Sequence, residues 1–86
     1  MATVTIRYWA AAKDAAGAAE EEVQAGTLAE ALDAALAGRP ADSPLRKVLS
    51  RSSFLVDGVQ AGRPAASDLV LHEGATIEVL PAFAGG

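Results

Sequence analysis

The residues best suited to chemistry in this chain are the last two, Gly85 and Gly86. Glycine lacks a Cβ, so a Gly-Gly segment can adopt conformations and enter narrow channels that larger residues would block. The Gly86 carboxylate would then be presented on a thin, bendable segment. The alternative is an inert, disordered end, because disorder is common at chain termini.

Other candidate groups are few. The chain has no cysteine, which excludes disulfides, thiolate nucleophiles and cysteine-ligated metals, and the single His72 cannot form a metal site alone. Glu20, Glu21 and Glu22 are adjacent, whereas the loops that bind hard cations need spaced ligands. These three carboxylates therefore predict a solvated strand edge. Without a catalytic acid, base or metal in the body of the chain, we expect a protein that is not itself an enzyme.

Composition narrows the class of partner. A chain of 86 residues is expected to form one domain. Its formal net charge of −4 argues against nucleic acid, because phosphate binding needs a clustered excess of Lys and Arg, and favours a basic or neutral protein partner. The start of the chain lacks signal-peptide features, and no apolar run approaches the roughly 20 residues of a membrane helix. We expect a soluble, cytoplasmic protein that binds no metal.

The first half of the chain predicts a strand, a short helix and a second strand. Residues 3–9 alternate between two faces, which is typical of a half-buried strand. Residues 10–16 are rich in alanine, and Gly17 is placed to end a helix there. Residues 20–23 predict the second strand. The side chains of the first strand that should face the core are Val4, Ile6 and Tyr8.

The main helix is predicted to begin at Thr27. Thr27 and Glu30 form a capping-box pattern, in which each side chain satisfies a backbone amide near the helix start. Gly38 and Pro40 then end the helix. One apolar stripe follows the helical period and should lie against a sheet: Leu28, Ala31, Leu32, Ala35 and Leu36.

A second start signal, Ser43 followed by Pro44, predicts a shorter helix that ends before Arg51. Its apolar positions are Leu45, Val48 and Leu49. Three basic residues fall on its exposed side: Arg46, Lys47 and Arg51. We interpret them as solvated surface or as a contact for an acidic partner.

The second half of the chain predicts a hairpin and a final strand. Asp57-Gly58 suits the positive φ angles of a type I′ turn after strand residues 54–56. Residues 62–64 should break the return strand, and residues 72–74 should form a surface turn that includes His72. Residues 76–80 alternate as a strand, and Pro81, which lacks an N–H, is expected to end the sheet ladder.

Together these elements predict an α+β fold with a mixed sheet of about five strands packed on one main helix. The first and last strands are joined by long crossovers and should pair in parallel at the centre of the sheet. The predicted core is Val4, Ile6, Tyr8, Leu28, Leu32, Leu36, Phe54, Val56, Ile77 and Val79.

Over its whole length the sequence resembles the MoaD/ThiS sulfur carriers, which are small β-grasp (ubiquitin-like) proteins ending in Gly-Gly. The resemblance implies a single β-grasp domain over residues 1–86 with a flexible tail over 81–86. It rests on residues 4–10 and the following helix with Gly17, the helix start at Thr27, the Phe54-Leu55-Val56-Asp57-Gly58 segment, the 71–74 turn and the 80–86 tail.

The resemblance implies that the Gly86 carboxylate is adenylated by an E1-like enzyme using ATP and converted to a thiocarboxylate that donates sulfur. The chain itself would bind no cofactor, since ATP belongs to the activating enzyme. A carboxylate is a poor electrophile, which agrees with the need for such activation. The implied partners are the E1-like enzyme and a sulfur-accepting enzyme such as the large subunit of molybdopterin synthase.

The pathway stays open. Length and the main helix favour the small subunit of molybdopterin synthase, but Leu80-Pro81-Ala82 departs from a double-proline pattern frequent in that branch. Ala82 resembles the tails of carriers for cysteine biosynthesis, and carriers for sulfur-containing secondary metabolites look similar. Two other classes are a ubiquitin-like modifier that joins Gly86 to lysines by an isopeptide bond and a binding module with an inert tail.

Trp9 and Leu80 fall on the face opposite the core positions of their strands, so we expect both to be exposed. An exposed apolar patch beside the tail would suit a partner interface, with Pro81 stiffening the tail exit and Phe83 anchoring it. Ala84 would follow Phe83 into the partner's channel ahead of the glycines. The alternative is that Trp9 folds over an edge of the sheet into the core, because Trp is usually highly buried.

Overall fold

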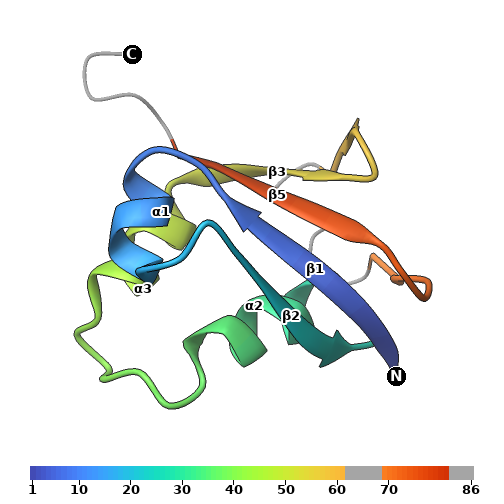
Figure 1. Ribbon diagram of the computed structural model, residues 1–86, viewed down its shortest axis with the longest axis horizontal. Coiled ribbons are helices and arrows are strands. Elements are labelled where there is room, and N and C mark those ends of the chain that lie inside the picture. The colour runs from blue at the N-terminus through green and yellow to red at the C-terminus, as the bar shows by residue number, and fades with distance from the viewer. Residues whose placement is uncertain (62–68, 82–86) are drawn as a thin grey trace.

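A mixed five-stranded sheet carries its helices on one face in the computed structural model, which describes residues 1–61 and 69–81 (Figure 1). The order of the strands is β2-β1-β5-β3-β4. The strands are β1 (Ala2–Tyr8), β2 (Glu20–Ala25), β3 (Ser52–Val56), β4 (Val59–Gln60) and β5 (Thr76–Pro81). This is the β-grasp arrangement that the sequence predicted.

The two central strands, β1 and β5, pair in parallel, with Ile6 opposite Ile77 and Tyr8 opposite Val79. All four of these side chains are buried. The other strand pairs are antiparallel. The parallel central pair is therefore confirmed, and it follows from the long crossover between the first and last strands.

Three helices cover the core face: α1 (Ala11–Ala16), α2 (Leu28–Leu36) and α3 (Pro44–Ser50). Gly17 ends α1 in the left-handed region, with its N–H donating to the Lys13 carbonyl. Both hydrogen bonds of the capping box between Thr27 and Glu30 are present at the start of α2. Ser43 caps α3. The longest of these helices has nine residues, and none in the described part of the chain is long and apolar enough to span a bilayer.

The core is built from the inner faces of β1 and β5 and from buried residues of all three helices. Seven of the ten predicted core positions are buried: Val4, Ile6, Tyr8, Leu28, Phe54, Ile77 and Val79. The prediction was wrong for Leu32, Leu36 and Val56, which are only partly buried. Leu28, Ala31 and Ala35 are the buried residues of α2, so Leu32 and Leu36 pack along the flank of the helix.

The predicted type I′ hairpin between β3 and β4 is confirmed, since Asp57 and Gly58 have φ angles of 52° and 84°. Asp57 also accepts a hydrogen bond from the Thr76 backbone N–H at 3.0 Å and contacts His72 Nε2 at 2.6 Å. His72 is exposed, as expected. These contacts tie the hairpin turn to the start of β5. Residues 62–64, which were predicted to end the return strand of the hairpin, lie outside the described residues.

The contact between His72 and Asp57 predicts a pH-dependent stability. Both His72 ring nitrogens face acceptors, the Glu73 carbonyl and the Asp57 carboxylate, so only the imidazolium satisfies both. The Glu73 carbonyl first, and Asp57 second, raise the pKa of His72 above its ordinary 6.5. The Thr76 amide first, and His72 second, lower the pKa of Asp57 below its ordinary 3.8.

The stabilisation by His72 is therefore fully present below pH 6.5 and lost as pH rises through the raised pKa. The stabilisation of the folded state by Asp57 is present above pH 3.8 and is lost as pH falls through the lowered pKa of Asp57. We expect His72→Gln to lower the melting temperature at about pH 5 and to have little effect at about pH 9. An equal effect of the substitution at both pH values would rule out the charged pair.

Candidate docking site at the end of β5

The last strand ends at Pro81, one residue later than expected, and Pro81 pairs with Ser52 of β3. Pro81 therefore ends the ladder, as expected, but is itself the last paired residue. Pairing between β5 and β1 stops at Val79. The N–H that Pro81 lacks therefore leaves no hydrogen-bond acceptor on β1 without its donor. The Ser52 hydroxyl, itself buried, donates to the Val48 carbonyl of α3 at 2.6 Å and fixes this corner of the sheet.

The predicted tail residues Phe83, Ala84, Gly85 and Gly86 lie outside the described residues. Their roles therefore stay predictions. The described chain fixes where the tail starts, because Pro81 lies at the end of the sheet where β1 finishes and β3 begins (Figure 1).

Trp9 lies beside this end of β5. Its backbone N–H donates to the Val79 carbonyl at 3.3 Å, and its indole Nε1 donates to Glu78 Oε1 at 3.2 Å. Trp9 is 47% exposed, so the alternative that places it in the core is wrong. Leu80 lies on the same face as Glu78 but is half-buried rather than exposed, because the central strand is flanked on both sides.

Arg7 joins Trp9 on the solvent face. Its guanidinium carbon lies 6.0 Å from the centroid of the Trp9 ring, and its Nε lies 3.4 Å from Glu20 Oε2. Such exposed pairs contribute little stability, but they orient the aromatic ring. A recess of about 130 Å³ opens beside them, lined by Arg7, Tyr8, Trp9, Lys13, Ala19 and Glu20.

Sequence reasoning missed the roles of Arg7 and Glu78. The signal was available, because strand alternation places Arg7 on the face of Trp9 and Glu78 on the face of Leu80. The parallel register of β1 and β5 then sets Arg7 opposite Glu78. The solvent face at this point therefore combines an aromatic ring with charges of both signs.

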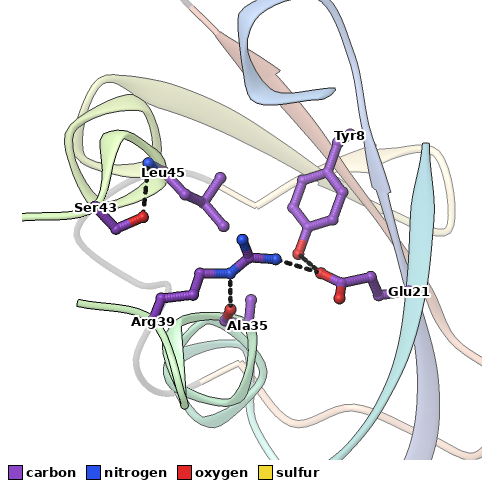
Figure 2. A network of polar contacts seen from close by, with 6 residues as sticks. All are labelled: Tyr8, Glu21, Ala35, Arg39, Ser43 and Leu45. Atoms are coloured by element: carbon purple, nitrogen blue, oxygen red, sulfur yellow. Dashed lines mark hydrogen bonds and ion pairs between the residues drawn. The ribbon is translucent and has the colours of Figure 1, made fainter. Parts of the chain in front are cut away.

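A polar network on the core side holds Tyr8, the neighbour of Trp9 (Figure 2). The Tyr8 hydroxyl donates to Glu21 Oε1 at 2.8 Å, and Arg39 donates to the same oxygen at 3.2 Å and to the Ala35 carbonyl at 2.8 Å. Burial first, and Glu21 second, raise the pKa of Tyr8, so its hydroxyl stays protonated and remains a donor. The network ties β1 and β2 to the end of α2.

This network corrects one detail of the predicted acidic edge. Glu20 and Glu22 are exposed as expected, but Glu21 is half-buried and paired with Arg39. No sequence signal pointed to Arg39, which lies in the loop after α2. Across residues 1–61 and 69–81, no three His, Asp or Glu side chains lie close enough together to hold a metal ion.

Comparison with known proteins identifies the fold and the family of this chain. Small archaeal modifier protein 1 from Methanosarcina acetivorans superimposes with a TM-score of 0.83 at 21% identity, covering 100% of this chain and 98% of that one. A chain in the complex of subunits 1 and 2 of molybdopterin-converting factor from Helicobacter pylori 26695 superimposes with a TM-score of 0.69 at 21% identity, covering 98% of this chain and 99% of that one. The putative subunit 1 of molybdopterin converting factor from Pyrococcus furiosus superimposes with a TM-score of 0.71 at 16% identity, covering 96% of this chain and 100% of that one.

At these identities the structural matches establish the β-grasp, ubiquitin-like fold. Among curated proteins, the sequence search found no match. The model of the ThiS family matches residues 6–86, which is nearly the whole chain and includes the Gly-Gly end. The chain belongs to the ThiS family.

Proposed function

We propose that this chain is a sulfur-carrier protein whose Gly86 carboxylate is activated and converted to a thiocarboxylate. The observation that carries the proposal is the family match, which extends through Gly86. The fold supports it, because β5 is a central strand anchored on both sides and ends at Pro81, just before the tail. A rigid body that ends in Gly-Gly can deliver a carboxylate into another protein's active site.

The proposed chemistry has two steps. A carboxylate oxygen of Gly86 attacks the α-phosphorus of ATP, which forms an acyl adenylate and releases pyrophosphate. A sulfur nucleophile at the oxidation level of sulfide then attacks the acyl carbon and expels AMP, which leaves the thiocarboxylate. Activation is needed because the free carboxylate is anionic at neutral pH and a poor electrophile.

The catalytic groups for both steps would belong to partner enzymes. An E1-like enzyme would supply ATP binding and adenylation, and a sulfur-accepting synthase would use the product. Molybdopterin synthesis is the pathway we favour, since the Helicobacter pylori match comes from a complex of the two subunits of molybdopterin-converting factor. Cysteine or a sulfur-containing secondary metabolite is the other destination for the sulfur.

The test is exchange of labelled pyrophosphate into ATP by the E1-like enzyme of the same organism. We expect exchange to depend on this chain and to saturate with its concentration. An exchange rate that is the same with and without the chain would reject its activation. A ubiquitin-like modifier would also pass this test, so the product must be identified separately.

We further propose that Trp9, Leu80, Pro81 and Phe83 dock the carrier onto its partners. Trp9 is the large exposed side chain beside the tail exit, and Arg7 and Glu78 hold its ring. Pro81 stiffens the exit, and Phe83 would fix the register of the tail in a channel. Aromatic anchors of this kind contribute about 2 kcal/mol each to binding.

Trp9→Ala and Phe83→Ala should each weaken binding to the E1-like enzyme or the synthase large subunit about thirtyfold. Neither should lower the melting temperature much. Val59→Ala is the matched control, because Val59 is also exposed but lies on β4 at the edge of the sheet. If Trp9→Ala unfolds the protein and Phe83→Ala leaves the Kd unchanged, this docking surface is wrong. Isothermal titration and thermal melts give the two readouts.

A further inference from the structure

The Lys and Arg side chains in the described part of the chain fall into two groups. Arg7 and Arg39 are paired with the carboxylates of Glu20 and Glu21. The second group has no ion pair with any residue in 1–61 or 69–81, and all its members are exposed. Its members are Lys13, Arg46, Lys47 and Arg51.

These four residues come from one end of the molecule. Lys13 is on α1, and the others are on α3 or directly after it. The two helices pack together, and both contact β5 (Figure 1). Arg51 immediately precedes Ser52, the residue that pairs with Pro81. Lys47 lies four residues before Arg51 and so projects from the same side of α3.

Two carboxylates, those of Asp14 on α1 and Asp42 just before α3, lie close to these cations in the chain, and the other described carboxylates lie on β2, α2 or β5 or in turns. Asp57 and Glu73 lie at the opposite end of the sheet, where β3 ends and β5 begins. Glu30 and Asp33 are on α2. The four cations therefore outnumber Asp14 and Asp42 by two, in a chain whose net charge is −4. Such a local excess of positive charge orients a protein as it approaches an oppositely charged surface.

We propose that Lys13, Arg46, Lys47 and Arg51 form a basic collar that docks against an acidic surface of the E1-like activating enzyme. The collar lies beside the residue after which the tail begins, so contact there would direct the tail toward the active site. This inference rests on the proposed function. A protein surface is favoured over nucleic acid or an anionic membrane, because the negative net charge repels an extended polyanion.

The test compares two variants with the same change in net charge. Lys47→Gln/Arg51→Gln removes two positive charges from the collar, and Val59→Glu/Gln60→Glu adds two negative charges on β4, at the far edge of the sheet. All four positions are exposed, so both variants should fold, which thermal melts will check. Pyrophosphate exchange then gives kcat and KM for each protein at several salt concentrations.

At about 20 mM salt we expect the collar variant to raise KM about tenfold with kcat unchanged. The difference should shrink toward zero at about 0.5 M salt, where charges on the surface are screened. The β4 control should stay close to the unmodified protein. Equal KM values for the two variants, or a raised KM of the collar variant that salt does not restore, would overturn the proposed docking role of the collar.

Two further outcomes bear on the inference. Exchange that does not depend on the unmodified chain would reject the proposed function itself, and the collar's role with it. Binding of a short DNA duplex at about 0.15 M salt that is lost in Lys47→Gln/Arg51→Gln would assign the collar to a polyanion and overturn an acidic protein surface as its partner.

Discussion

Deleting Gly86 should reduce adenylation by the E1-like enzyme below detection while leaving the melting temperature unchanged. The deletion leaves Gly85 as the terminal carboxylate and withdraws it by about 3.5 Å, the span of one extended residue. Since a misplacement of about 1 Å can cost roughly a hundredfold in rate, the shortened tail should not react. Pyrophosphate exchange and thermal melts provide the two measurements.

Extending the chain beyond Gly86 should have the same effect, because the reacting carboxylate is then an internal amide. Ala84→Gly is the control that keeps the length and the Gly-Gly end, and it should remain active. Normal sulfur donation by the extended protein would contradict a role for the Gly86 carboxylate.

Leu28→Ala should be the more damaging of two matched substitutions on α2. Leu28 is completely buried, so its truncation should cost about 2 to 5 kcal/mol in the free energy of unfolding. Leu32→Ala should cost less, because Leu32 is only partly buried and the lost side chain leaves a smaller cavity. Urea unfolding of both variants gives the comparison through the midpoint and slope. A larger loss for Leu32→Ala would contradict the orientation of α2.

Much of the fold follows from local signals in the sequence. Thr27 and Glu30 set the start of α2 through contacts within four residues, and Asp57-Gly58 sets the hairpin through its φ angles. The parallel pairing of β1 with β5 follows from the length of the crossover. These features depend on near neighbours or on chain connectivity, so a single sequence is enough to predict them.

The rotation of α2 could not be predicted in the same way. Leu28, Leu32 and Leu36 share one apolar stripe with Ala31 and Ala35, and hydrophobicity favours placing the leucines innermost. The structure instead buries both alanines and leaves Leu32 and Leu36 at the flank. Which part of a wide stripe faces the sheet depends on space between elements distant in the sequence.

The docking site was predicted only in outline. Strand alternation placed Trp9 on the solvent face, but the contacts that hold its ring come from Arg7 on β1, the strand that Trp9 directly follows, and from Glu78 on β5. Arg39 reaches Glu21 from a loop with no pattern of its own. Contacts of this kind depend on how separate elements lie in space, so no periodicity in the sequence reveals them.

The sulfur-carrier function is tested most directly by the intact mass of the protein after incubation with its E1-like enzyme, ATP and a sulfur source. We expect a mass increase equal to the exchange of one oxygen for sulfur, located at Gly86 by fragmentation and absent when ATP is omitted. An unchanged mass when the acyl adenylate demonstrably forms, or a product joined to lysine through Gly86 in place of the thiocarboxylate, would contradict the sulfur-carrier function.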